Sequence, residues 1–148
     1  MGTKPQTLAY ALTDSPIGLA AWIVEKFHGW SDRKEDIDRQ FTRDILLTNI
    51  MIYWVTGAIG STFWPYYARQ HEPWIVPDGA SVMVPTGYAE HPREILTPPR
   101  SLAEPFYGNI LRWTRMPAGG HFPALEYPDA LSSEIQAFFR LIDCPSSS

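Results

Sequence analysis

The sequence predicts an α/β fold whose sheet is incomplete. Two short strand-like segments lie in the second half of the chain, with a long connection between them, and an amphipathic segment follows the second one. Strands joined in this way and followed by a helix are typical of a parallel α/β layer. Parallel sheets are normally built from several strands, and a two-stranded pairing is marginal in water. We therefore expect this chain to form only part of a larger sheet.

The composition indicates a folded chain and excludes several classes of protein. Of the 148 residues, 45% are hydrophobic and 14% are aromatic, which is enough for a sizeable core. The net charge is -4 and the lysines and arginines are scattered, so no nucleic-acid partner is predicted. Cys144 is the single cysteine, which rules out a disulfide within the chain. The N-terminal residues lack the apolar stretch of a secretory signal, and we expect a cytoplasmic chain.

The first helix is expected to begin after Ser15. This residue is a suitable N-cap, and Pro16 fits the first helical position because its missing N–H would be unpaired there. We expect the helix to run to Phe27 and to stop at Gly29. Apolar residues recur in it at steps of three and four, which predicts one buried face made of Ile17, Ala20, Ala21, Val24 and Phe27.

A second, longer helical region is expected after the charged segment 31–40, which we interpret as a solvated loop. Thr42 is the expected N-cap of this region, and Gly57 or Gly60 is expected to break it. Residues 45–68 carry no charge, and about 20 apolar residues would span a bilayer. The interval also contains several threonines, glycines and a proline, which favour a buried pair of helices over a transmembrane span.

The second half of the chain predicts strands, loops and a last helix. Residues Ser81–Val84 are expected to form a short buried strand, and residues 109–116 alternate with a period of two, as a second strand does. A proline-rich loop, 92–105, lies between them, and Gly119 to His121 form a turn. The final helix is expected over 128–142, with its broad apolar side made of Ala130, Ile135, Phe138, Phe139 and Ile142.

Glu94 and His121 are the strongest candidates for chemistry. Each follows one of the two expected strands, and functional groups in open α/β sheets gather beyond the carboxyl ends of the strands. A carboxylate that orients an imidazole and stabilises its protonated form makes histidine an effective base near neutral pH. Their spacing alone does not distinguish such a pair from a surface glutamate and an unrelated turn histidine.

Longer stretches of sequence separate these alternatives. Residues 84–96 and 116–128 resemble the last catalytic segments of microsomal-type epoxide hydrolases, including the juvenile-hormone branch. Residues 14–27, and 47–50 followed by Tyr53 and Trp54, are similar to cap segments of the same family. The resemblance extends over residues 4–142, with the four segments in the family's order.

The resemblance implies the C-terminal part of an α/β-hydrolase fold. This part consists of late cap helices, the last two parallel strands and the terminal helix. We accordingly expect the C-terminal part of the helical cap over 1–70, a linker over 71–80, the C-terminal part of the hydrolase core over 81–142, and a flexible tail over 143–148.

The resemblance also implies roles for individual residues. His121 matches the family's general base and Glu94 its acidic partner, with Glu90 as the nearest competitor for the second role. Tyr66 matches a cap tyrosine that hydrogen-bonds to the epoxide oxygen, and Tyr67 is the alternative one residue away. The family usually has an arginine where Trp64 stands, which makes the register of this segment less secure. The aromatic residues Trp22, Trp54, Phe63 and Trp64 suit either of two roles, the lining of an apolar substrate pocket or plain core packing.

The attacking half of the family's site is missing from this sequence. The nucleophile of the family is an aspartate in a Gly-x-Asp-x-Gly elbow, and no such motif occurs here. The implied partners are a small apolar epoxide, water and an N-terminal portion that carries the nucleophile, and a homo-oligomer is left open. No metal or cofactor is implied. We expect the chain alone to be inactive.

Two other interpretations remain at this point. One is a fragment of another hydrolase with the same acid and histidine, such as a haloalkane dehalogenase, against which the Tyr66 segment argues. The other is a non-catalytic binding or scaffold protein left by truncation. Coding sequence upstream of Met1 with a nucleophile elbow would favour the epoxide hydrolase portion, whereas a stop codon there would favour the scaffold.

Overall fold

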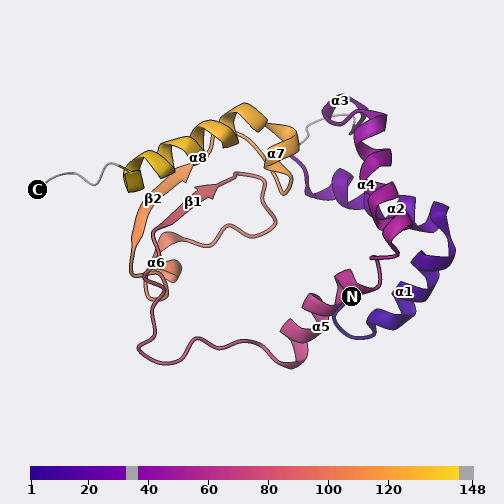
Figure 1. The fold of residues 1–148 in the computed structure, drawn as a ribbon, viewed down its shortest axis with the longest axis horizontal. Helices are drawn as coiled ribbons and strands as arrows, with labels where there is room; N and C mark the ends of the chain where they lie inside the picture. Colours follow the sequence, from indigo (N-terminus) through magenta and orange to yellow (C-terminus); the bar gives the residue numbers. More distant parts are fainter. Residues whose placement is uncertain (33–36, 144–148) are drawn as a thin grey trace, which may run out of the picture. The chain divides into compact units, whose positions relative to one another are not determined.

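The computed structural model describes residues 1–32 and 37–143, which divide into two compact units. The first unit contains residues 1–29 and 37–75 and is helical, and the second contains residues 30–32 and 76–143 and holds the sheet (Figure 1). Residues 33–36 of the predicted loop and residues 144–148 of the predicted tail lie outside the described residues.

Two helices open the first unit. Helix α1 spans Pro5–Asp14, and α2 spans Pro16–Trp30. Ser15 caps α2 as predicted, because its Oγ accepts a hydrogen bond from the backbone N–H of Gly18 at 3.0 Å. The predicted stop at Gly29 was wrong. Gly29 does not adopt the positive φ that ends many helices, and the helix continues by one more residue to Trp30.

The buried face of α2 also differs from the prediction. Leu19, Ile23 and Phe27 are its buried residues, whereas Ile17 is 81% exposed. Helix α2 carries apolar residues around most of its circumference, so the spacing of its apolar residues does not select one face. Tertiary packing makes that choice.

The second helical region is broken where the glycines predict it. After the short helix α3, Ile37–Gln40, which lies inside the predicted loop, α4 spans Arg43–Thr56 and begins with the predicted cap. The Thr42 Oγ1 accepts the N–H of Ile45 at 3.3 Å. Gly57 ends α4 with a φ of 64°, a conformation that glycine adopts without strain. A 3₁₀ turn, Ser61–Phe63, then leads into α5, Trp64–His71.

The first unit has an apolar core of its own. The rings of Phe27 and Phe41 meet edge to face, with centroids 5.0 Å apart, and Phe41 is 1% exposed. The other buried apolar residues of this unit are Pro5, Leu12, Leu19, Ile23, Leu46, Ile50, Ile59 and Phe63.

Within residues 1–32 and 37–143, no single helix has both the length and the apolar character needed to cross a bilayer. Two pairs meet the requirements of length and composition only when both helices are taken together, α1 with α2 and α4 with the segment Ser61–His71, and these are bent by 118° and 105°.

The second unit contains a parallel two-stranded sheet, as predicted. Strand β1 spans Thr86–Glu90 and β2 spans Ile110–Arg115, and the pairing runs from Thr86 opposite Ile110 to Glu90 opposite Arg115. The predicted strand Ser81–Val84 was wrong, because Val82 forms only an isolated bridge with Tyr107 and Val84 is 67% exposed. Pro85 interrupts the segment and has no N–H to donate, so the continuous ladder begins at the next residue.

Helices complete the second unit. The proline-rich loop contains α6, Arg100–Ala103, and the turn after β2 leads to α7, Pro123–Glu126. The predicted last helix is α8, Pro128–Asp143, which lies along the sheet (Figure 1). A Cβ on Gly87 of β1 would lie 2.7 Å from the Phe138 ring, so strand and helix are in close contact here.

A bidentate ion pair also joins α8 to β2. Arg112 Nε and Nη2 donate to the two carboxylate oxygens of Glu134, at 2.5 and 2.7 Å. The hydrogen bond from Arg112 lowers the pKa of Glu134, and one from Thr114 acts in the same direction. The pair therefore stays charged at neutral pH.

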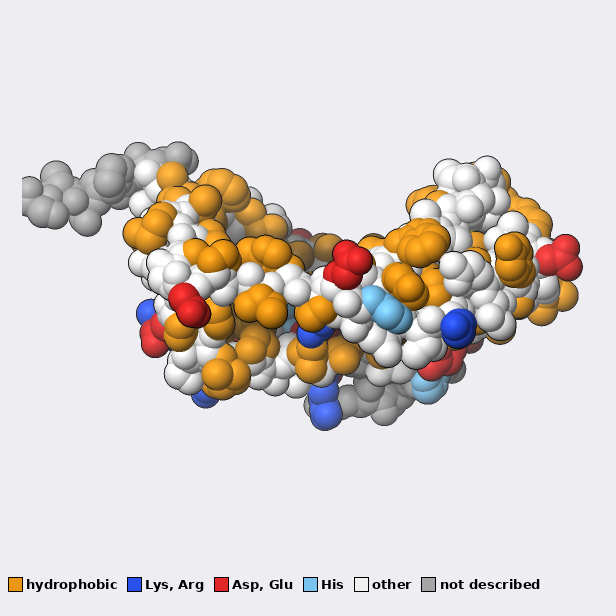
Figure 2. Space-filling view, turned by 90° about the horizontal axis from the view of Figure 1, so that it is seen from below, with side chains coloured by type: hydrophobic (Ala, Val, Ile, Leu, Met, Phe, Trp, Pro, Cys, Tyr) orange, Lys and Arg blue, Asp and Glu red, His pale blue; other side chains and the backbone are white. Residues whose placement is uncertain are grey.

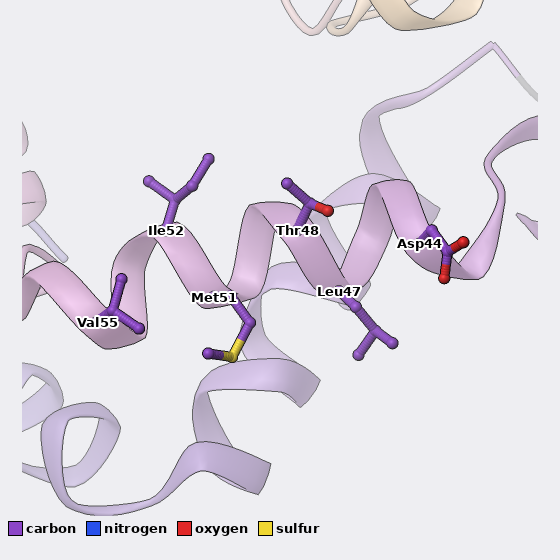
Figure 3. A pocket seen from close by; sticks show the side chains of 6 residues that line it. All are labelled: Asp44, Leu47, Thr48, Met51, Ile52 and Val55. Atoms are coloured by element: carbon purple, nitrogen blue, oxygen red, sulfur yellow. The ribbon is translucent and has the colours of Figure 1, made fainter.

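Many apolar side chains of the described residues face solvent. Figure 2 shows hydrophobic side chains spread over the visible face, and in the second unit the exposed ones include Leu111, Ile135 and Phe139. In the first unit, one face of α4 lines a shallow pocket of about 380 Å³ (Figure 3). Its lining consists of Asp44, Leu47, Thr48, Met51, Ile52 and Val55, none of which is a predicted site residue.

Candidate active site

The structure brings His121 and Glu94 together beyond the carboxyl ends of the two strands. Glu94 follows β1 and His121 follows β2, and because the strands are parallel, both loops leave the sheet at the same edge. The His121 Nδ1 lies 2.8 Å from the Glu94 Oε1. The same glutamate oxygen accepts the backbone N–H of Ile95 at 2.6 Å, which fixes the carboxylate.

This geometry suits a base. When Nδ1–H donates to the carboxylate, Nε2 carries the free lone pair of the neutral ring and can accept a proton. The imidazole is 40% exposed and the Glu94 side chain 27% exposed, so water can reach the ring. The assignment of a catalytic role to the two residues stays a prediction.

Glu90, the competitor for the acidic role, is engaged elsewhere. Its Oε2 accepts the indole N–H of Trp113 at 3.1 Å, and its Oε1 lies 3.6 Å from Arg115 Nε. Glu94 is the carboxylate that contacts His121.

Two aromatic rings flank the imidazole. The rings of Trp30 and Phe122 both meet it edge-on, at centroid distances of 5.1 and 5.2 Å. Trp30 also accepts the backbone N–H of His121 through its carbonyl oxygen, at 2.8 Å. Trp30 is the last residue of α2 and lies about 90 positions from His121 in the sequence, so no local pattern indicated this contact.

Two carboxylates hold the turn that carries His121. Glu126 is 8% exposed and accepts the backbone N–H groups of Asp32, Gly120 and Phe122, the first at 2.6 Å. Asp32 accepts the N–H of Gly119 at 2.8 Å. Sequence analysis missed both residues, because a buried acceptor of backbone N–H groups has no signature in sequence.

His91 packs against the same turn from the strand side. It is 6% exposed, and its Nδ1–H donates to the carbonyl oxygen of Ala118 at 3.1 Å. Its Nε2 has no hydrogen-bond partner within the described part of the chain. Gly119 has a φ of 114°, and a Cβ there would lie 2.4 Å from the His91 Nδ1, so the turn requires glycine.

Tyr127 and Tyr88, which lie near carboxylates of the site, have raised pKa values. Burial, followed by the charges of Asp32 and Glu126, raises the pKa of Tyr127, and a hydrogen bond to Asp32 adds to the effect. Burial and the charges of Glu90 and Glu94 raise the pKa of Tyr88. Both phenols are therefore neutral hydrogen-bond donors at neutral pH.

Sequence comparison identifies proteins that are similar to this chain. No protein-family profile matches the chain. The chain is 41% identical over 156 residues to epoxide hydrolase 1 of Oryctolagus cuniculus, an alignment that covers 95% of this chain and 33% of the rabbit protein. It is also 41% identical over 151 residues to juvenile hormone epoxide hydrolase 2 of Ctenocephalides felis, covering 95% and 32%.

Structure comparison gives the same result. The crystal structure of juvenile hormone epoxide hydrolase from the silkworm Bombyx mori superposes with a TM-score of 0.78 at 32% identity, covering 95% of this chain and 38% of that one. The chain is homologous to epoxide hydrolases over nearly its whole length. It corresponds to a C-terminal portion of the α/β-hydrolase fold and spans about a third of the length of the curated relatives it matches.

Tyr66, the residue predicted to bind the epoxide oxygen in an epoxide hydrolase, lies on α5 of the first unit and is 46% exposed. The alternative, Tyr67, stacks on His71 with a centroid distance of 3.9 Å and meets Trp64 edge to face at 5.8 Å. Tyr67 thus packs against side chains of its own helix, and Tyr66 is the more exposed of the two residues. The oxygen-binding role of Tyr66 stays a prediction.

The four aromatic residues expected to line an epoxide pocket all lie in the first unit and differ in exposure. Phe63 is 2% exposed in the core, where it meets the edge of Trp22 at 6.1 Å. Trp22 also has the Lys26 ammonium 4.1 Å from its ring centroid. Trp54 and Trp64 are 36% and 49% exposed. Phe63 is held by packing in the core, and the lining of an epoxide pocket by these residues stays a prediction.

Proposed function

We propose that the chain supplies the base half of the catalytic site of an epoxide hydrolase, which converts epoxides to vicinal diols. The observation that supports this function is the 2.8 Å contact between His121 Nδ1 and Glu94 Oε1 beyond two parallel strands. The family relationship supports the same reaction, because relatives over nearly the whole chain are named epoxide hydrolases.

In the proposed reaction, an aspartate from a portion outside these 148 residues attacks the less hindered epoxide carbon. The carbon–oxygen bond of the ring breaks, a covalent ester forms, and the epoxide oxygen takes up a proton from the Tyr66 phenol that hydrogen-bonds to it. The His121 Nε2 then removes a proton from water, and the resulting hydroxide attacks the ester carbonyl. The diol leaves and the carboxylate is regenerated, and the proton taken up by His121 returns through solvent to the Tyr66 phenolate, which restores both groups.

The contacts of His121 explain why this ring would be the base. Glu94 holds the Nδ1–H tautomer and stabilises the imidazolium that forms when Nε2 takes the proton. Trp30 and Phe122 restrict the tilt of the ring through their edge contacts. The step that this chain would perform is therefore hydrolysis of the ester, and formation of the ester would depend on the other portion.

The proposal divides the chain by task. Residues 1–70 would form the C-terminal part of a cap that presents Tyr66, 71–80 a linker, and 81–142 the part of the core that carries Glu94 and His121. The partners would be a small apolar epoxide, water and the nucleophile-bearing portion.

A complementation experiment tests this function. Residues 1–148 would be joined to the N-terminal portion of the silkworm juvenile hormone epoxide hydrolase, and diol formation from styrene oxide would be measured for the joined protein and for the 148-residue chain alone. We expect diol from the joined protein and none from the chain alone. His121→Gln should abolish turnover, whereas His28→Gln, on the exposed side of α2, should leave it unchanged.

Two results would contradict the proposal. Diol formation by the purified 148-residue chain would show that no separate nucleophile is needed. Full activity of the His121→Gln variant in the joined protein would exclude the histidine as the base.

A further inference from the structure

Four consecutive backbone N–H groups hold the turn that carries His121 in place. Gly119 donates to Asp32, Gly120 and Phe122 donate to Glu126, and His121 donates to the Trp30 carbonyl oxygen. Three of these four bonds end on a carboxylate. We propose that Asp32 and Glu126 are positioning residues for ester hydrolysis, acting through the His121–Glu94 pair. This inference rests on the proposed function and assigns two further residues to it.

Glu126 connects two segments that are far apart in the sequence. Its Oε2 accepts the Asp32 N–H at 2.6 Å, and its Oε1 accepts the N–H groups of Gly120 and Phe122 at 3.2 and 3.0 Å. The carboxylate is buried, so its hydrogen bonds face little competition from water. Bonds from N–H groups to an ionised acceptor are about twice as strong as bonds between neutral groups.

Asp32 connects the loop that carries His121 with the loop that carries Glu94. One carboxylate oxygen accepts the Gly119 N–H, two residues before His121, and the other lies 3.8 Å from Arg93 Nε, next to Glu94. Arg93 is tied to the turn a second time, because its backbone N–H donates to the Gly119 carbonyl oxygen at 3.0 Å. The Asp32 side chain is 10% exposed.

The backbone approach shows how little freedom this turn has. A Cβ on Gly120 would lie 2.6 Å from the Trp30 carbonyl oxygen and 2.7 Å from the Asp32 nitrogen. Residues 30–32 and the His121 turn are therefore in backbone contact, with Glu126 bonded to both. Without the Asp32 and Glu126 carboxylates, the turn would lose three of its hydrogen bonds, and the distance from His121 to Glu94 would no longer be fixed. A displacement of about 1 Å can cost about 100-fold in rate.

Single-turnover kinetics of the joined protein test the inference. The rates of ester formation and ester hydrolysis would be measured separately for Asp32→Asn and Glu126→Gln, with Glu104→Gln as control. Glu104 is an exposed glutamate paired with Arg100 on α6. We expect ester hydrolysis to slow by about 10- to 100-fold in both test variants, with ester formation within about twofold of the parent. The control should change neither rate.

Nuclear magnetic resonance of the 148-residue chain gives a second measurement that is independent of activity. The hydrogen-bonded Nδ1–H signal of His121 should be present in the parent and in Glu104→Gln, and should be lost or shifted in both test variants. The NMR measurement remains informative if the joined parent protein forms no ester. That result would overturn the proposed function, but it would not decide whether Asp32 and Glu126 position His121.

Three outcomes would overturn the positioning role. These are an equal slowing of ester formation and hydrolysis, unchanged hydrolysis together with an unchanged His121 signal, and failure of both test variants to fold. The last outcome would mean that the two carboxylates serve folding and not placement of the base.

Discussion

The two units of this chain are stabilised by different means. Ten of the eleven buried apolar residues within the described ranges, Pro5 included, belong to the helical unit, and Met116 is the one in the sheet unit. The two buried polar or charged residues, His91 and Glu126, both belong to the sheet unit and contact the His121 turn. The helical unit packs around its own apolar core, whereas the sheet unit is organised by hydrogen bonds to backbone groups.

This difference follows from the portion of the fold that the chain represents. A parallel sheet is normally covered on both faces and flanked by further strands, and here two strands pair with α8 on one face. Leu111, Ile135 and Phe139 therefore remain exposed. The His121 turn keeps its geometry because its partners, Trp30, Asp32 and Glu126, are all contained in this chain. Substitutions in each unit distinguish these two kinds of stabilisation.

The largest effect is expected from Gly120→Ala in the sheet unit. The new Cβ would lie within 2.8 Å of three backbone atoms of residues 30–32, so the turn must move away from them. We expect ester hydrolysis by the joined protein to fall by about 100-fold or more. Rapid-quench measurement of the ester would check this, and hydrolysis within twofold of the parent would contradict the close contact.

The next effect is expected in the core of the helical unit. Phe41→Ala removes a ring that is 1% exposed and packs against Phe27, and it should lower the free energy of unfolding by about 3–5 kcal/mol. Urea denaturation followed by circular dichroism would measure the loss. The same truncation at exposed Phe139, 54% accessible, should cost far less in the 148-residue chain, and equal costs would contradict the difference between the units.

A smaller effect, dependent on pH, is expected from the ion pair between α8 and β2. The hydrogen bond from Arg112 lowers the pKa of Glu134 below its ordinary value of 4.5. The Glu134 carboxylate therefore binds a proton less tightly in the folded chain than in the unfolded chain. The resulting stabilisation is complete above about pH 4.5 and is lost as the pH falls through the lowered pKa. Glu134→Gln should therefore destabilise the chain at pH 7 and have less effect at pH 3.

Denaturation curves of this variant at the two pH values provide the measurement. Glu104→Gln, which alters the exposed pair with Arg100, serves as the control and should change stability little at either pH. A loss in Glu134→Gln that is equal at pH 7 and pH 3 would show that the ion pair contributes nothing.

The smallest effect is expected from Gly57→Ala at the end of α4. Gly57 has a φ of 64°, but no atom lies within 4 Å of the position of a new Cβ. The cost is then the backbone strain alone, about 1–2 kcal/mol, visible as a small shift in the denaturation midpoint. Measured by the same denaturation, a larger loss in the free energy of unfolding for Gly57→Ala than for Gly120→Ala would contradict the assignment of close backbone contact to the sheet unit.

Local features of the fold were predictable from the sequence. The caps at Ser15 and Thr42, the break at Gly57, the strand over 110–115 and the last helix depend on short-range chemistry, and all are confirmed. The face of α2 and the strand expected at Ser81–Val84 were wrong. Both errors concern burial, which depends on partners that are distant in the sequence.

The candidate site divides in the same way. His121 and Glu94 follow two strands of similar direction, so the topology alone could bring them together. Asp32 and Glu126 bond to backbone N–H groups across long stretches of sequence, and such a contact does not depend on any motif around the acceptor. Only the folded chain reveals them.

The most direct test of the proposed role of His121 is to trap the covalent ester that it would hydrolyse. In the joined protein, His121→Gln leaves the nucleophile and Tyr66 unchanged but removes the group that would activate water. Incubation with styrene oxide followed by mass spectrometry of the intact protein should show the mass of one added epoxide, persisting while the parent returns to its original mass. A His121→Gln protein that forms no adduct, or that clears it as fast as the parent, would contradict the assignment of His121 as the base.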